Sequence, residues 1–164
     1  MGIWESFWIG SASTIFGGIV LAIFFFWVRE KWFGVADVTG KWHFNMITQK
    51  TVYNPYKDME LHYVGVIWRE GNQLHGSVEK VYEKSSTGER PYIGEHRSRG
   101  KLTGTYEKNY FSKDRVHIHV SEQGKGREST NYFTLTVNKR RLRGNFCSFV
   151  ADQEGVSRWQ REPF

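Results

Sequence analysis

Residues 6–28 read SFWIGSASTIFGGIVLAIFFFWV, and this stretch decides how the rest of the chain is organised. It lies between Glu5 and Arg29 and contains no charged residue. As an α-helix it would extend about 34 Å, enough to cross a hydrocarbon core roughly 30 Å thick. A cleaved signal peptide is the main alternative, but the preceding MGIWE is not basic and no A-x-A-like cleavage site follows a short apolar core. We therefore predict one retained transmembrane helix within residues 1–30.

The distribution of positive charge predicts the orientation of this helix. The first Lys or Arg of the chain is Arg29, and Lys31 follows it closely. Because positive residues flank the cytoplasmic end of a membrane helix, we expect the N-terminus outside and the C-terminal domain in the cytoplasm. The single Cys147 fits a reducing compartment. These features predict a single-pass protein of the cell inner membrane.

Small residues recur at every fourth position of the apolar run. They are Gly10, Thr14, Gly18 and Ala22. Such a stripe lets two helices approach closely in lipid, so we expect it to support a homo-oligomer. The alternative is that small residues are simply common in membrane helices. The bulky Phe16 and Ile23 lie on the other side and suit contact with lipid.

The remainder of the chain is basic. All 23 Lys and Arg lie in residues 29–164, whereas one of the 17 Asp and Glu is Glu5, so this region has a formal charge of +7. Such a balance favours anionic partners, namely nucleotides, nucleic acid or lipid headgroups. A basic domain held beside an acidic membrane would equally need no specific ligand. We divide the region into a juxtamembrane linker, residues 31–38, and one domain, residues 39–164.

From residue 40 the apolar pattern changes from helical to alternating, which is typical of β-strands. The predicted strands are Gly40–Gln49, Met59–Glu70, Gln73–Glu83, Tyr92–Tyr106, Arg115–Gln123, Glu128–Asn138, Arg141–Asp152 and Gly155–Gln160. Short turn signals separate them, among them residues 71–72, 124–126 and 138–140. Connections this short favour antiparallel hairpins.

Recurring glycines predict that the strands close into a small barrel. The pattern L-x-G-x-apolar occurs at residues 74–78, 102–106 and 142–146. Glycine weakens a strand unless the strand bends sharply or another backbone comes close, and a tightly coiled sheet needs both. The Gly40-Lys41-Trp42 start is similar to that of lipocalin-like barrels, in which the Trp plugs one end. We therefore expect an all-β, closed, eight-stranded antiparallel, lipocalin-like barrel after one transmembrane helix.

Alternation along the strands predicts which side chains face the interior. The expected inward residues are Trp42, Phe44, Met46, Leu74, Val78, Val116, Ile118, Val120, Phe133, Leu135, Val137, Leu142, Phe146 and Val150. They would fill one end of the barrel. A barrel of eight strands is either filled with side chains or holds one small ligand.

The sequence indicates binding rather than catalysis. It contains no phosphate loop, no H-E-x-x-H motif and no nucleophile elbow, so we expect no enzyme activity. His117 and His119 share one strand face, but no Cys or carboxylate lies at a useful spacing, and we expect no metal site. Cys147 is expected to pack as a small hydrophobic residue.

One group of polar and aromatic residues could hold an anionic ligand with aromatic rings. Tyr faces stack on bases, and Arg side chains pair with phosphate oxygens. The candidate ligand contacts are Asn54, Tyr56, Tyr92, Arg97, Arg99, Asn131 and Tyr132, and Arg127 lies beside the last two. Because surface loops contain many Tyr, Asn and Arg residues, we expect the group as a whole to contain the ligand site and do not assign a contact to each residue.

The run from Asp37 to Lys84 contains TGKW, NPYKDMELHY and GNQLHGSVEKVYE. It resembles the SMODS-associated transmembrane, β-strand-rich effectors of CBASS, the cyclic-oligonucleotide-based antiphage signalling of bacteria. The resemblance implies a barrel that binds a cyclic dinucleotide made by a cGAS-like nucleotidyltransferase, rather than polymeric nucleic acid. It further implies assembly in the inner membrane, membrane disruption and death of the infected cell. Members of that family typically carry two transmembrane helices, whereas this sequence shows one apolar run.

Two other classes of function remain open at this point. A membrane-anchored lipocalin-like carrier of an apolar ligand would have a wholly apolar cavity. A membrane scaffold that binds no ligand would have a filled interior. A cavity lined by Arg and Tyr would favour the nucleotide receptor.

Overall fold

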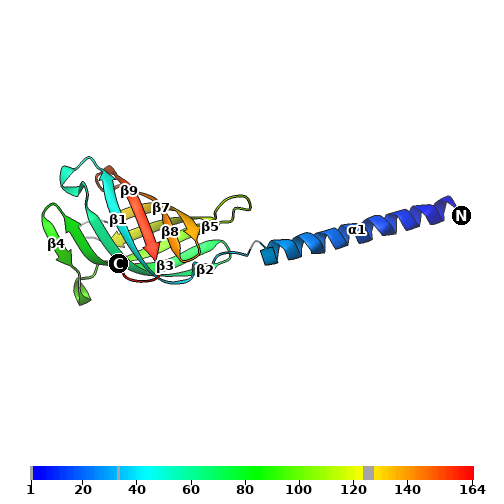
Figure 1. Ribbon diagram of the computed structural model, residues 1–164, viewed down its shortest axis with the longest axis horizontal. Helices are drawn as coiled ribbons and strands as arrows, with labels where there is room; N and C mark the ends of the chain where they lie inside the picture. The colour runs from blue at the N-terminus through cyan, green and yellow to red at the C-terminus, as the bar shows by residue number, and fades with distance from the viewer. Residues whose placement is uncertain (1, 33, 124–127) are drawn as a thin grey trace. The chain divides into compact units, whose positions relative to one another are not determined.

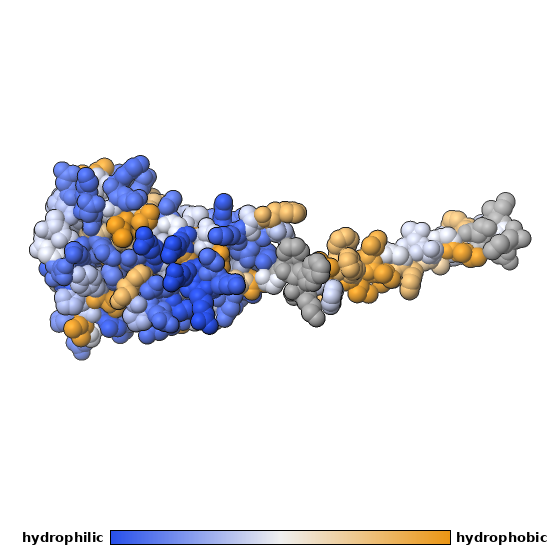
Figure 2. Space-filling view, in the orientation of Figure 1, coloured by the Kyte–Doolittle hydropathy of each residue, from blue (hydrophilic) through white to orange (hydrophobic). Residues whose placement is uncertain are grey.

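The computed structural model describes residues 2–32, 34–123 and 128–164, and the chain forms two compact units, residues 1–35 and 36–164 (Figure 1). The first unit is helix α1 (Ile3–Trp32). Its segment Phe7–Val28 is long and apolar enough to span a membrane, and a signal sequence near an N-terminus would meet the same two criteria. Figure 2 shows apolar side chains along this helix and a largely hydrophilic face on the second unit.

The second unit is a closed antiparallel barrel of eight strands, as predicted. Neighbours in sequence pair with each other, and the last strand pairs with the first, which closes the barrel. The barrel strands are β1 (Gly40–Lys50), β2 (Glu60–Glu70), β3 (Gln73–Ser85), β5 (Arg99–Glu107), β6 (Arg115–Gln123), β7 (Glu128–Asn138), β8 (Arg141–Ser148) and β9 (Gln153–Gln160). A ninth strand, β4 (Gly88–Pro91), pairs with the last part of β3. Closure leaves the eight strands without an open edge.

Two predicted strands are shorter in the structure. The strand predicted at Tyr92–Tyr106 begins only at Arg99, as β5. Residues Gly94–His96 form a 3-10 turn before it, and Gly94 has φ +58°. The predicted strand Arg141–Asp152 ends at Ser148, because a 3-10 turn at Val150–Asp152 follows and Ala151 has φ +56°. The predicted turn at residues 124–126 lies outside the described residues.

The repeated glycines of the L-x-G-x-apolar pattern allow neighbouring strands to approach each other closely. A Cβ atom on Gly76 would collide with the carbonyl oxygen of Val66 on β2. A Cβ atom on Gly144 would likewise collide with that of Thr134 on β7, and Gly104 on β5 is equally confined. The glycines therefore permit the tight coiling that a barrel of eight strands requires, as the sequence predicted.

Large aromatic side chains fill one end of the barrel, which we call the linker end because Ala36–Gly40 enters there. The Trp42 indole is fully buried and donates a hydrogen bond to the Val38 carbonyl oxygen at 2.8 Å. The guanidinium of Arg161 lies over the Trp42 ring, 3.9 Å from its centroid. Deeper inside, Phe44 stacks on Trp159 with 3.8 Å between ring centroids. The Trp plug predicted from Gly40-Lys41-Trp42 is thus present.

Every predicted inward residue is buried except Val150, which lies in the 3-10 turn after β8. Toward the other end of the barrel, which we call the mouth, the inward positions become polar. The buried polar residues of this half include Thr48, Glu122, Asn131, Ser148 and Gln153. The interior therefore changes from an aromatic core at the linker end to a hydrogen-bonding lining at the mouth.

Candidate ligand-binding site at the mouth of the barrel

A cavity of about 240 Å³ lies at the mouth. Its lining residues come mainly from seven strands, β1, β2, β3, β6, β7, β8 and β9, and from the 3-10 turns Asn54–Tyr56 and Val150–Asp152. The lining residues are Met46, Tyr56, Met59, Leu61, Tyr63, Lys80, Glu83, Glu122, Ser129, Asn131, Ser148, Val150 and Gln153. The cavity is smaller than most ligand pockets, which occupy roughly 300–1,000 Å³. It can therefore enclose one flat, polar group, while the rest of a larger ligand would lie at the rim.

The Glu122 carboxylate is the most enclosed charge of the cavity. Its side chain is only 5% exposed and lies 3.5 Å from the ammonium of Lys80. The Tyr63 hydroxyl donates a hydrogen bond to Glu122 at 3.0 Å. Burial, with the adjacent Glu122 charge, raises the pKa of Tyr63 well above its usual value. Tyr63 therefore remains a donor and holds the carboxylate in place.

A second carboxylate, Glu83, lies on the other side of Lys80. The Lys80 ammonium lies 3.6 Å from Glu83, and the Tyr92 hydroxyl donates a hydrogen bond to Glu83 at 2.9 Å. Lys80 also lies over the Tyr92 ring, 5.2 Å from its centroid. One lysine between two glutamates leaves the lining with more acceptor oxygens than cationic donors. A ligand group with N–H donors would therefore be matched by this wall.

Strands β7 and β9, with the end of β8, contribute amide and hydroxyl groups to the lining. Gln153 is held by hydrogen bonds from Thr48 and to the Val150 carbonyl oxygen, and Ser148 donates to the Thr130 carbonyl oxygen. Asn131 is only 6% exposed and lines the cavity. Within residues 2–32, 34–123 and 128–164, its side chain has no hydrogen-bond partner. Its amide atoms are not among the enclosed, unpaired polar atoms of the described residues, so they are open to the cavity and available to a ligand.

The predicted contacts do not all meet at this cavity. Tyr56 and Asn131 line the cavity. Tyr92 does not, but its hydroxyl donates a hydrogen bond to the lining residue Glu83. Asn54 belongs to the same 3-10 turn as Tyr56 (Asn54–Tyr56) but is exposed and does not line the cavity. Arg127 lies outside the described residues.

Arg97 and Arg99 lie on the outer surface of the barrel, where both contact one carboxylate. Glu79 accepts a hydrogen bond from Arg97 at 3.2 Å and forms an ion pair with Arg99 at 3.3 Å. Glu79 follows the inward Val78 on β3 and therefore faces outward. The structure thus brings the two arginines together, but away from the mouth cavity.

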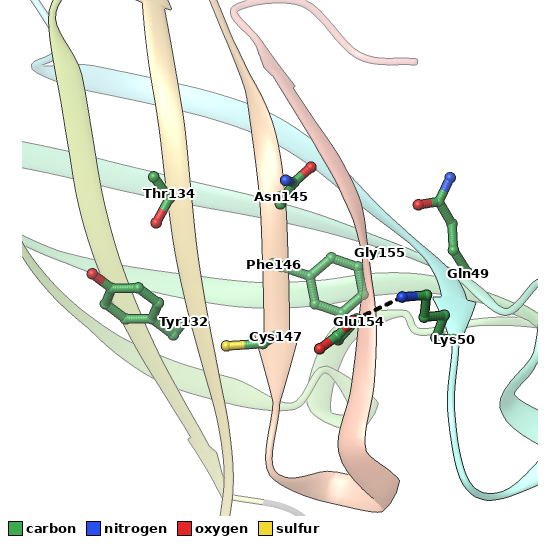
Figure 3. Close-up of a pocket in the computed structure, with 9 residues that line it drawn as sticks. All are labelled: Gln49, Lys50, Tyr132, Thr134, Asn145, Phe146, Cys147, Glu154 and Gly155. Atoms are coloured by element: carbon green, nitrogen blue, oxygen red, sulfur yellow. Dashed lines mark ion pairs between the residues drawn. The ribbon is translucent and has the colours of Figure 1, made fainter.

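Tyr132 also lies on the outer surface, at a hollow of about 530 Å³ that extends over β7, β8 and β9 (Figure 3). Its hydroxyl lies 3.1 Å from His117 Nδ1, and His117 Nε2 lies 3.1 Å from Glu107. Cys147 is exposed in the same hollow, so the prediction that it packs as a hydrophobic residue is wrong. Phe146 takes the inward position of β8, and its neighbour Cys147 must face outward.

Sequence reasoning missed the charged residues of the lining, although the alternation contained the signal. Glu122 continues the inward series of Val116, Ile118 and Val120 on β6. Lys80 continues that of Leu74 and Val78 on β3. An ionisable residue at an inward position of a strand indicates that this part of the barrel interior is polar. The predicted contacts were instead chosen from polar and aromatic residues, many of them in loops.

No protein-family model matches this sequence, and no curated protein sequence matches it. The function is therefore inferred from the fold and from the residues of the mouth cavity.

Proposed function

We propose that this protein is a membrane-anchored receptor whose barrel binds a small polar ligand at the mouth. The expected ligand is a cyclic dinucleotide, and the expected role is that of an effector in antiphage defence. The observation that carries the proposal is the polar cavity itself, whose lining holds both the Asn131 amide and the Lys80–Glu122 pair. A barrel that served only as a scaffold would gain nothing from burying these groups.

A nucleotide would fit this arrangement by placing one base inside and its backbone at the rim. Base N–H groups would donate to Glu122 or Glu83, and the Asn131 amide would pair with a base edge. Tyr56 lies at the rim beside Tyr53, with ring centroids 4.9 Å apart, and offers a face for stacking. Lys80 would contribute positive charge toward a phosphate. The small volume supports a base rather than a whole dinucleotide inside the barrel.

The membrane part of the proposal rests on helix α1. Anchored with its N-terminus outside, this helix would hold the barrel on the cytoplasmic side of the inner membrane. The small residues Gly10, Thr14, Gly18 and Ala22 would form the contact between helices in a ligand-driven oligomer. The Thr14 hydroxyl donates to the Gly10 carbonyl oxygen at 3.0 Å, so the stripe presents no unpaired hydroxyl to lipid. Assembly of many helices would disrupt the membrane and kill the cell.

The two alternatives fit the cavity less well. An apolar-ligand carrier requires an apolar lining, whereas this lining contains Lys80, Glu83, Glu122 and Asn131. A scaffold requires a filled interior, and only the linker half of the barrel is filled by aromatic side chains. The polar, open half therefore favours a receptor for a polar ligand.

The proposal is tested by thermal unfolding of the full chain in detergent with a panel of cyclic dinucleotides. A ligand that binds only the folded state at 100 times its dissociation constant stabilises it by about 2.7 kcal/mol. We expect at least one cyclic dinucleotide to raise the melting temperature by several degrees, and the matching linear dinucleotides to act more weakly. A panel in which no member shifts the transition would refute the cyclic dinucleotide as ligand.

A further inference from the structure

The linker end of the barrel carries most of the net positive charge of the domain. Its segments, residues 36–41, 68–73, 106–115, 138–142 and 160–164, contain nine Lys or Arg and five Asp or Glu, a formal charge of +4. The described segments at the mouth, residues 48–60, 79–99, 121–123, 128–130 and 148–154, contain seven Lys or Arg and ten Asp or Glu, a formal charge of −3. The two ends of the barrel therefore differ in charge, and the linker end is the one suited to an extended anionic surface.

A shallow basic hollow lies at this end, beside the β7–β8 turn. It is lined by Ala36, Asp37, Thr39, Lys139, Arg140, Arg161 and Glu162. Arg161 is held in place by donating to the carbonyl oxygens of Lys41 and Asp37, at 3.1 and 3.2 Å. Lys139 and Arg140 are exposed, and neither forms an ion pair with another residue of the described ranges. Two cations are thus presented to solvent at a fixed turn.

An apolar side chain projects from the same end. Phe111, in the β5–β6 loop, is 105% exposed and lies between Tyr110 and Lys113 in a short basic, aromatic sequence. The loop begins where Tyr106 and Asp114 fix its base, since the Tyr106 hydroxyl and the Asn109 amide both donate to Asp114. A fully exposed aromatic ring beside cations is the pattern of segments that lie at a membrane interface.

Chain geometry brings the linker end close to any membrane that α1 spans. The helix ends at Trp32 and the barrel unit begins at Ala36. At about 3.6 Å per extended residue, these two Cα atoms are separated by at most about 14 Å. The mouth is at the far end of the strands, so the charged and apolar groups described above are those nearest to Ala36.

We propose that the linker end rests on an anionic lipid surface. Lys139 and Arg140 contact headgroup phosphates, and Phe111 enters the interface between headgroups and acyl chains. Each basic side chain near an anionic leaflet contributes to such attachment, and salt screens the attraction. The proposal rests on the membrane anchor of the proposed function and is independent of the ligand.

The test uses the full chain with Cys147→Ser, which removes the only cysteine of the sequence. Phe111→Cys is labelled with an environment-sensitive fluorophore, and the protein is reconstituted into phosphatidylcholine vesicles with or without phosphatidylglycerol and a lipid-borne quencher. The matched control is the same label at Phe149→Cys, which is exposed near the mouth. We expect quenching and a blue shift at position 111 in anionic vesicles, with little of either at position 149.

A charge-reversal variant tests the contribution of the two cations. Lys139→Glu with Arg140→Glu should reduce quenching at position 111 by roughly half or more, as should added salt. The matched control, Lys57→Glu with Arg90→Glu, changes two exposed residues near the mouth and should leave it unchanged. Equal quenching at positions 111 and 149, or indifference to anionic lipid and charge reversal, would overturn the proposed surface.

Flotation of the vesicles separates this proposal from the anchor. Protein that floats with the vesicles but shows no quenching at position 111 refutes the surface and leaves the anchor standing. Protein that fails to float refutes the anchor, and the surface with it. Ligand-induced thermal stabilisation is measured in detergent and is affected by neither outcome.

Discussion

The ammonium of Lys80 lies 3.5 Å from the carboxylate of Glu122 inside the mouth of the barrel, where the Glu122 side chain is 5% exposed. An ion pair in this setting costs desolvation energy that its attraction repays only when the remaining polar atoms are also paired. Tyr63 and Glu83 provide those further partners. These partners hold the ion pair in place at the cavity, where it can present charge to a ligand.

The Lys80→Met variant should lower the free energy of unfolding by about 1–3 kcal/mol at pH 7, because Glu83 and Glu122 then face each other without a cation. The double variant Lys80→Met/Glu122→Gln should regain much of this loss. Urea unfolding of both variants in detergent measures the difference. The matched control is Lys84→Met, since Lys84 and Glu89 form an exposed pair. A double variant no more stable than Lys80→Met would mean that the carboxylates do not repel each other.

Asn131 should distinguish the mouth from the outer arginines as the ligand site. Asn131→Leu removes a buried amide and fills part of the cavity, so binding should weaken roughly tenfold or more, because an unpaired buried polar group costs about 1–3 kcal/mol. Arg97→Ala/Arg99→Ala should change affinity less than about threefold, since Glu79 already holds both guanidinium groups. Calorimetric titration with the stabilising nucleotide measures both. The reverse ranking would place the ligand on the outer surface.

Acid should destabilise the loop at the linker end through Asp114. Burial acts to raise the pKa of Asp114, but hydrogen bonds from Tyr106, Asn109 and Lys108 outweigh it and hold the pKa below the usual 3.8. A carboxyl group whose pKa is lowered by folding contributes stability above its unfolded pKa and loses it as the pH falls through the folded one. Unfolding free energies measured from pH 6 to about pH 2 should therefore fall less steeply in Asp114→Asn. Glu70→Gln, at an exposed position, should retain the wild-type slope.

Alkaline pH should destabilise the protein through Tyr106, whose hydroxyl donates a hydrogen bond to Asp114. Burial, with the hydrogen bond to Asp114, raises the pKa of Tyr106 from 10.0 to about 12. A group whose folded pKa is raised contributes stability that is complete below its unfolded pKa and disappears as the pH rises through the folded value. Stability should therefore fall between about pH 10 and pH 12, and Tyr106→Phe should remove this component. An identical alkaline slope in Tyr106→Phe would contradict the assignment.

The small-residue stripe of α1 should decide assembly but not insertion. Gly10→Leu/Gly18→Leu thickens the stripe while keeping the helix apolar, so the variant should insert and bind ligand normally, with assembly and toxicity lost. Crosslinking in membranes measures assembly. Ile23→Phe is the control, because it enlarges the other side of the helix. A glycine variant that crosslinks and kills like the parent would show that the barrel alone drives assembly.

The sequence by itself determined the elements of this protein and the direction of their side chains. An uncharged apolar run can satisfy its backbone in lipid only as a helix, so residues 6–28 predicted α1. Strand alternation has a fixed period of two, so it identified Phe44 and Phe133 as core residues. Glycines such as Gly144 indicated where backbones meet, because a side chain there would collide with the adjacent strand.

Only the tertiary structure decided which polar residues share a site. Lys80 and Glu122 lie 42 positions apart and meet because β3 and β6 both pair with β5 and line the same cavity. Arg97 and Arg99 looked equally suited to a phosphate, yet both turn outward to Glu79. Pairing of charges depends on distances between strands, and a sequence fixes only the spacing along each one. For the same reason, the mouth of the barrel and its basic linker end become visible only once the strands have closed.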